Sequence, residues 1–233
     1  MTSLNILSGG AAQGLVASLA ERFKRQTGFD ISGAFGAVGV MADKLRKGTP
    51  ADMVVLTSAL VADLARENLL VAASTRQVGR VETALAVRAA DRAVAVADTD
   101  ALRELLLNAD AIFVPDTKAS TAGIHVAKVL EQLGIAGKLS ARLKIYPNGA
   151  TAMRHLAESD AERPIGCTQS TEIISTRGVK FSGPLPRGYE LSTLYTAAIA
   201  TSAARSRQAQ ALIDLLTSSE QSELRRDAGF LEA

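Results

Sequence analysis

Short apolar runs alternate along the chain with segments that carry apolar residues at helical spacing. Leu4–Leu7 is a strand-like run, and the segment after it places Leu15, Leu19 and Phe23 four residues apart, on one face of a helix. Met53–Leu56 again has the uninterrupted apolar character of a buried strand. Further strands are predicted near Ile31 and at Thr83–Arg88, Ala111–Val114, Leu143–Tyr146, Pro164–Cys167, Val179–Phe181 and Leu191–Ile199, and further helices at Ala101–Leu107, after Thr121, at Ala150–Glu158, Ser206–Thr217 and Ser219–Asp227.

This repeated strand–helix–strand order predicts an α/β fold with mainly parallel sheets and helices on both faces. No flexible linker divides the chain, so a second lobe would have to be inserted into the first through two crossing segments. We place these segments near Val81–Leu85 and Leu185–Leu191. The expected lobes are therefore 1–82 with 188–233, and 83–187.

Composition excludes several classes of partner. The 26 basic and 24 acidic residues leave a net charge of +2, and only 4% of residues are aromatic, which argues against a nucleic-acid-binding surface. No apolar stretch approaches the length that crosses a bilayer, so we expect no direct membrane insertion. The single cysteine, Cys167, excludes an intrachain disulfide.

The start of the chain has no basic segment, apolar segment and small-residue cleavage site of the kind found in secretory signals. As written, the sequence therefore predicts a cytoplasmic protein. It predicts a periplasmic one if a precursor was trimmed.

Four turns rich in small or hydroxyl residues directly precede predicted helices. They are Ser8-Gly9-Gly10-Ala11, Ala37-Val38-Gly39-Val40, Ser120-Thr121-Ala122-Gly123 and Asn148-Gly149-Ala150-Thr151. Free N–H groups in a first helical turn and the helix dipole both favour a negative charge there. Most such turns serve only as caps, but four that converged could bind an anion without Lys or Arg. None matches a P-loop or a dinucleotide-binding fingerprint.

The order of these segments resembles the molybdate-binding protein family of the type 2 periplasmic binding proteins, from about Leu4 to Phe230. The resemblance rests on Asn5-Ile6-Leu7-Ser8-Gly9-Gly10-Ala11, on Lys47-Gly48-Thr49-Pro50-Ala51-Asp52 with the following Met53-Val54-Val55-Leu56-Thr57-Ser58, on Gly183-Pro184-Leu185-Pro186, on Leu215–Glu220 and on Ala228-Gly229-Phe230. It implies two α/β lobes, an anion held in the cleft between them, and a membrane ABC transporter as partner if the protein is exported.

Together the turns and the resemblance give a set of expected ligand-binding residues. The set is Ser8, Gly9, Gly10, Ala11, Gly39, Val40, Ser58, Ser120, Thr121, Gly123, Asn148, Gly149, Thr168 and Gln169. Two positions depart from the family: Val38 stands beside Ala37 where a serine is usual, and Cys167-Thr168-Gln169 stands where a tyrosine is common. Because a tetrahedral oxyanion needs donors on all sides, these losses favour a larger ligand that bears carboxylates over molybdate or tungstate.

Few residues offer covalent or acid–base chemistry. His125 lies just inside the helix that follows Ser120, and Cys167 follows a buried-strand pattern; they are the two weak catalytic candidates. His155 is expected on a helix surface. Two distant histidines and one cysteine give no metal site, and no cofactor is expected.

Three functions remain open from the sequence. The first is a solute-binding protein for a small anion. The second is an isomerase of a small polycarboxylate, because aconitate isomerase is similar to this same family and such chemistry needs carboxylate-holding donors and one proton shuttle. The third is a ligand sensor without chemistry.

Overall fold

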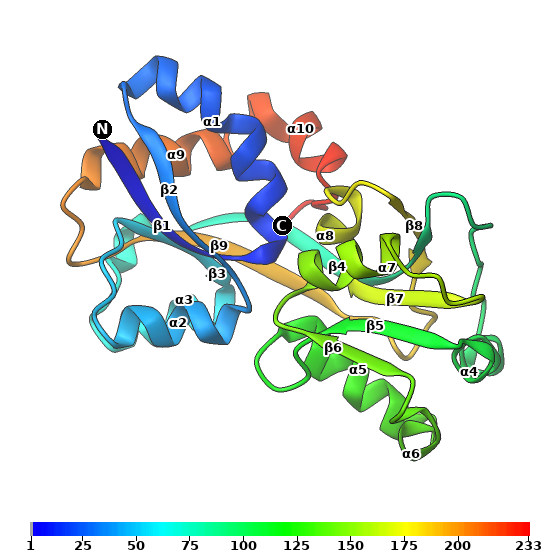
Figure 1. Ribbon diagram of the computed structural model, residues 1–233. Helices are drawn as coiled ribbons and strands as arrows, with labels where there is room; N and C mark the ends of the chain where they lie inside the picture. The colour runs from blue at the N-terminus through cyan, green and yellow to red at the C-terminus, as the bar shows by residue number, and fades with distance from the viewer. Residues whose placement is uncertain (1) are drawn as a thin grey trace. The chain divides into compact units, whose positions relative to one another are not determined.

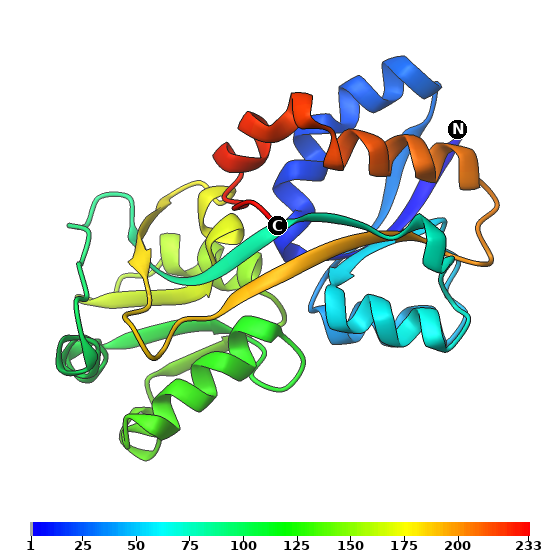
Figure 2. The same ribbon diagram turned by 180° about the vertical axis from the view of Figure 1, so that it is seen from behind.

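The computed structural model describes residues 2–233, so Met1 lies outside the described residues. The chain divides into two compact units. The first comprises Met1–Val81 and Thr193–Ala233, and the second comprises Glu82–Ser192. The chain passes from the first unit to the second within strand β4 (Arg76–Arg88) and returns at the start of strand β9 (Ser192–Ile199), which Figure 2 shows in teal and orange.

The first unit is built on the strand order β2-β1-β3-β9. Its strands are β1 (Ser3–Gly9), β2 (Asp30–Gly36) and β3 (Met53–Thr57), with β9. β1 pairs parallel with both β2 and β3, and β9 pairs antiparallel with β3. Its helices are the 3-10 turns η1 (Gly10–Ala12), η2 (Ala72–Ser74) and η3 (Ser219–Gln221), and α1 (Gln13–Thr27), α2 (Val38–Arg46), α3 (Ser58–Arg66), α9 (Ser206–Thr217) and α10 (Ser222–Asp227).

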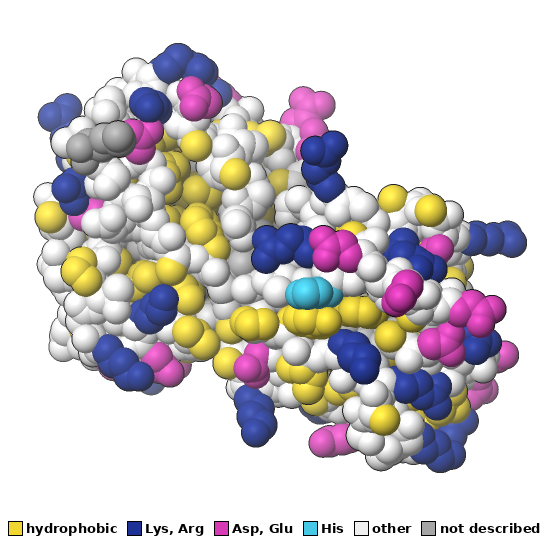
Figure 3. Space-filling view, in the orientation of Figure 1, with side chains coloured by type: hydrophobic (Ala, Val, Ile, Leu, Met, Phe, Trp, Pro, Cys, Tyr) yellow, Lys and Arg dark blue, Asp and Glu magenta, His cyan; other side chains and the backbone are white. Residues whose placement is uncertain are grey.

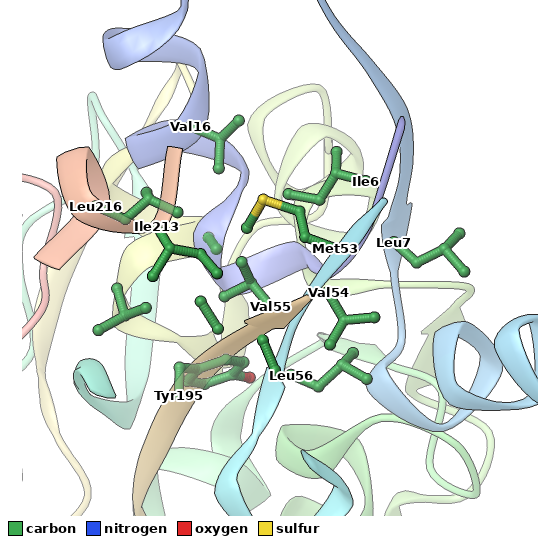
Figure 4. Packing of buried hydrophobic residues seen from close by; sticks show 14 of the residues in the cluster. Ile6, Leu7, Val16, Met53, Val54, Val55, Leu56, Tyr195, Ile213 and Leu216 are labelled. Atoms are coloured by element: carbon green, nitrogen blue, oxygen red, sulfur yellow. The ribbon is translucent and has the colours of Figure 1, made fainter. Parts of the chain in front are cut away.

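Helices cover both faces of this sheet: α1 and α9 lie on one side, and α2 and α3 on the other (Figure 1). β3 is buried on both faces, which explains its unbroken apolar run. Val16 of α1 and Ile213 and Leu216 of α9 face Met53 and Val55 of the sheet (Figure 4). Burial of these aliphatic side chains supplies the main favourable term in the stability of the unit.

The second unit has the strand order β4-β7-β5-β6, and β8 also pairs with β4. Besides β4, the strands of this unit are β5 (Ala111–Pro115), β6 (Leu143–Tyr146), β7 (Pro164–Gln169) and β8 (Val179–Pro184). β5 pairs parallel with β6 and β7, whereas β4 pairs antiparallel with β7 and β8. The helices are α4 (Thr99–Asn108), α5 (Thr121–Gln132), α6 (Ala136–Leu139), α7 (Gly149–Ala157) and α8 (Ser170–Ile174).

Two separate apolar cores show which helices cover which face of the second sheet. Leu85 and Cys167 pack with Val126 of α5, while Ala84 and Ala86 pack with Met153 of α7. Residues of β4 and β7 therefore alternate between an α5 face and an α7 face, as strand geometry requires. In Figure 1, α5 and α6 accordingly lie on the opposite side of this sheet from α7 and α8.

The strands and helices expected from the sequence are present, and the α/β fold is confirmed. The expectation of mainly parallel sheets is wrong in part, because β4, β8 and β9 pair antiparallel. Helices α6 and α8 were not predicted. β4 begins at Arg76 instead of Thr83, since its first residues are polar and lack a strand-like apolar run.

Candidate functional site

In the first unit, the turn after β1 is tightly packed. Ser8 is fully buried, and its hydroxyl donates to the Gly9 carbonyl at 3.0 Å. A Cβ on Gly9 would lie 2.8 Å from Val38 Cγ1 and 3.0 Å from the Tyr195 ring. Gly10 and Ala11 are also buried, in the turn that leads into α1. Only a glycine fits at position 9, and the Ser8 hydroxyl is an internal donor.

Helix α2 begins at Val38, inside the turn that was expected to precede it, with Ala37 as its N-cap. Val38 is buried against Gly9, Gly39 is half-buried, and Val40 is exposed. No side chain caps this helix. Any hydrogen bond from this turn to a ligand would therefore come from backbone N–H groups.

At the end of β3, Ser58 starts α3, and its hydroxyl lies 2.6 Å from the Thr196 hydroxyl of β9. Thr193, also on β9, is buried, and its hydroxyl has no hydrogen-bond partner in the protein. Ser58 and Thr196 therefore form a hydroxyl pair where β3 ends beside β9, whereas Thr193 is three residues from Thr196 and so points to the opposite face of β9.

In the second unit, α5 begins at the loop after β5. Asp116 Oδ1 accepts the N–H groups of Lys118 and Ala119, at 2.7 and 2.9 Å, and shapes this loop. Ser120 is buried, and Thr121 is half-buried at the first helical position. A Cβ on Gly123 would collide with the carbonyl oxygen of Asp116, so glycine is required for α5 to pack against the end of β5.

The turn before α7 is contacted by a buried carboxyl group of the chain itself, that of Glu172. Asn148 Oδ1 caps the helix by accepting the Thr151 N–H at 2.9 Å. The buried carboxylate of Glu172 accepts the Thr168 hydroxyl at 2.6 Å and the backbone N–H groups of Gly149, Ala150 and Gln169. Burial raises the pKa of Glu172, and these four donors offset part of that shift.

The expectation that Asn148, Gly149 and Thr168 bind a ligand stays a prediction, but several of their hydrogen-bonding groups already have partners within the protein. The first helical N–H groups of α7 and the Thr168 hydroxyl are taken by Glu172, and the Asn148 oxygen is taken by its own helix. The carboxylate that takes them lies 23 residues beyond Gly149 in the sequence.

Three buried polar side chains of the second unit have atoms without a hydrogen-bond partner in the protein. These atoms are the Thr83 and Thr171 hydroxyls and both amide atoms of Gln169. Thr83 and Gln169 are opposite each other in the β4–β7 ladder, so their side chains share one face. That face is the α5 face, because Leu85 and Cys167, two residues away along each strand, pack in the α5 core.

The two catalytic candidates are engaged elsewhere. Nε2 of His125 lies 2.7 Å from the Tyr189 carbonyl oxygen, so this ring nitrogen is paired with the backbone. Cys167 is buried in the α5 core, and burial raises its pKa to about 12. A thiol with this pKa is not a nucleophile at neutral pH. His155 is exposed and stacks on Tyr146, with ring centroids 4.4 Å apart.

Sequence reasoning missed Glu172, Thr83 and Thr171. A signal for Glu172 was present: it stands three residues after Gln169, the N-cap of α8, which is the spacing of a capping box. Thr83 stands at the start of the strand that was predicted, where a hydroxyl residue usually marks only a strand end.

Three further observations concern charge, membrane spans and metal ligands. On the face shown in Figure 3, basic and acidic side chains are intermixed and form no block of one sign. Within residues 2–233, no helix is long and apolar enough to cross a membrane. The same residues contain no group of three or more His, Cys, Asp or Glu side chains placed to hold a metal ion.

Comparison with known proteins identifies the family. Residues 4–231 match the family of bacterial extracellular solute-binding proteins. The chain belongs to this family. Among curated relatives of this solute-binding protein, an aconitate isomerase of Pseudomonas sp. is 25% identical over 240 residues, covering 99% of this chain and 88% of the relative. The molybdate-binding protein ModA of Escherichia coli (strain K12) is 22% identical over 198 residues, covering 84% and 76%.

Among solved structures, the periplasmic molybdate-binding protein of Azotobacter vinelandii superposes with a TM-score of 0.80 at 19% identity, over 99% of this chain and all of that one. This similarity confirms the type 2 periplasmic-binding-protein fold expected from the sequence. The relatives differ in what they act on, so the ligand has to be argued from the site.

Proposed function

We propose that this solute-binding protein binds a small organic anion bearing carboxylate groups, outside the cytoplasmic membrane, and delivers it to an ABC transporter. Support comes chiefly from the buried and unpartnered side chains of Thr83, Gln169 and Thr171. A buried polar group without a partner costs about 1–3 kcal/mol. A ligand that supplies those partners would recover that cost, which favours binding.

The chemistry of the group suggests the class of ligand. A carboxamide and hydroxyls can both donate and accept, so they suit carboxylate, hydroxyl and carbonyl oxygens alike. α5 packs against β7, and its first turn of N–H groups, from Thr121 to Gly123, favours a negative charge. No Lys or Arg is among these residues, so the anion would be held by uncharged donors. Contact of one ligand with both units is a further prediction of the sequence.

A thermal-shift panel tests the proposal. Small di- and tricarboxylates, with and without hydroxyl groups, are compared with molybdate, sulfate and phosphate at equal ionic strength. At least one carboxylate is expected to raise the melting temperature and to bind in calorimetry. Gln169→Ala and Thr83→Val should each weaken that binding about tenfold or more, as loss of a hydrogen bond to a charged group implies. His155→Ala, at an exposed stacked residue, should leave it unchanged. Normal binding by both site variants, or no response to any carboxylate, would refute the proposal.

Isomerase activity is the second candidate, favoured by the 25% identity to an aconitate isomerase. The engaged positions of His125 and Cys167 leave neither as an obvious proton shuttle. Proton NMR of a bound carboxylate in deuterated water separates the two functions. A binding protein leaves the carbon-bound protons of its ligand unexchanged, whereas an isomerase exchanges them or moves the double bond.

A further inference from the structure

The end of β7 presents different chemistry on its two faces. Thr168 points to the α7 face, where its hydroxyl meets the Glu172 carboxylate. Gln169 points to the α5 face, where its carboxamide has no partner in the protein. The carboxyl and hydroxyl groups on one face are therefore paired with each other, whereas the buried carboxamide on the other face has no partner within the protein.

The fit around Glu172 is close. A Cβ on Gly149 would collide with Glu172 Oε2 and with Thr168 Oγ1, so glycine is the only residue that lets the carboxylate reach the first turn of α7. The nine residues of α7 give this turn a full set of first-turn N–H groups. With four donors directed at it, the carboxylate occupies the position of a bound anion.

We propose that Glu172 is a specificity-determining residue: it fills the anion site of α7 with an internal carboxylate and so excludes free tetrahedral oxyanions from the binding edge of the second unit. This inference rests on the proposed function and names what the site rejects. Like charges brought together in a buried site repel strongly, so a second anion is disfavoured beside Glu172. A tetrahedral oxyanion also loses the donors that Glu172 has already taken. An organic anion can keep its charge on the α5 face and turn an uncharged part toward Glu172.

Removal of the side chain tests whether it stands in for a bound anion. Glu172→Ala should leave a space of carboxylate size lined by the same four donors. Sodium formate and sodium acetate should then raise the melting temperature of this variant saturably, beyond the effect of sodium chloride at equal ionic strength. Wild type, Glu172→Gln and the exposed control Glu162→Ala should show no such response. A Glu172→Ala protein that melts cooperatively and ignores both anions overturns the proposal.

Selectivity is measured in parallel by calorimetry with molybdate and sulfate. Glu172→Gln, which removes the charge and keeps the shape, should bind at least one of them about tenfold or more tightly than wild type does. Equal affinities in the two proteins contradict the proposal.

If Glu172→Ala does not fold, the backbone amide NMR spectrum of Glu172→Gln is compared with that of wild type to test the contact between Glu172 and the turn of α7. The N–H resonances of Gly149, Ala150 and Gln169 should shift most, and unchanged resonances would overturn the assignment. The stabilisation of Glu172→Ala by formate does not depend on the natural ligand. Its absence would therefore count against the role of Glu172, whereas a lack of response in the carboxylate panel would count against the proposed function.

Discussion

The strongest test of how the sequence builds the first unit is the substitution Asp52→Asn. Asp52 is only 2% exposed and lies just before β3. Its Oδ2 accepts the Asn5 N–H of β1 at 2.8 Å, and its Oδ1 accepts the Arg205 N–H before α9 at 2.9 Å. One carboxylate therefore ties together three segments that are distant in the sequence.

Asparagine keeps the shape but offers one acceptor oxygen instead of two. One of the two backbone N–H groups would then face an NH₂ donor in a buried site. Hydrogen bonds to a charged group contribute about 1.5–3 kcal/mol, and an unpaired buried donor costs about 1–3 kcal/mol. The Arg205 side chain lies 3.7 Å from Asp52 and is one-third exposed, so its loss adds little. We expect the free energy of unfolding to fall by about 2–4 kcal/mol.

Urea unfolding at neutral pH, followed by circular dichroism, measures this change as a shift of the midpoint. The matched control is Asp43→Asn, because Asp43 is exposed and pairs only with Arg46, three residues away on the same helix. The control should change stability by less than about 0.5 kcal/mol. If Asp52→Asn costs no more than the control, the structural role assigned to Asp52 is wrong.

Two further predictions concern the second unit. Gly123→Ala should destabilise the second unit by about 1–3 kcal/mol, because the added methyl group meets the Asp116 carbonyl. The control Gly137→Ala, with open space around the added methyl group, should be neutral or stabilising. Thermal unfolding compares the two variants, and equal effects would contradict the packing described for Gly123. Because burial raises the pKa of Cys167 from 9.0 to about 12, the unfolded chain loses the thiol proton first as pH rises. Relative to Cys167→Ala, wild type should therefore lose about 1.4 kcal/mol of stability per pH unit above pH 9, and parallel stability curves would refute this.

Much of the fold follows from local patterns. β3 is predictable because burial on both faces requires an apolar run, and α1 because its buried residues recur at helical spacing. The pairing directions are harder to predict. β9 has the composition of a buried strand whether it runs parallel or antiparallel to β3, and only the path of the chain decides between them.

The candidate site was predictable only in outline. Helices α1, α2, α5 and α7 do begin at or just after the four small-residue turns, because these residues suit helix starts and close packing. Which turns keep free donors depends on contacts between residues that are distant in the sequence. The turn of α7 resembles that of α5 in sequence, yet it is the turn of α7 that donates to the distant carboxyl group of Glu172.

The difference between those two turns bears on how a binding protein without a charged donor can discriminate among anions. Arg or Lys at the site would attract any anion of suitable size, and selectivity would then have to come from shape. Among Thr83, Gln169, Thr171 and Glu172, the one ionisable side chain is Glu172, and the side chains without a partner are a carboxamide and hydroxyls. Affinity then requires that each ligand oxygen meet a directed donor, since a mismatched polar group stays unpaired at a cost of about 1–3 kcal/mol. Such a site rejects ligands by their unmet hydrogen bonds as well as by their charge, which favours a ligand with several differently placed oxygens over a compact oxyanion.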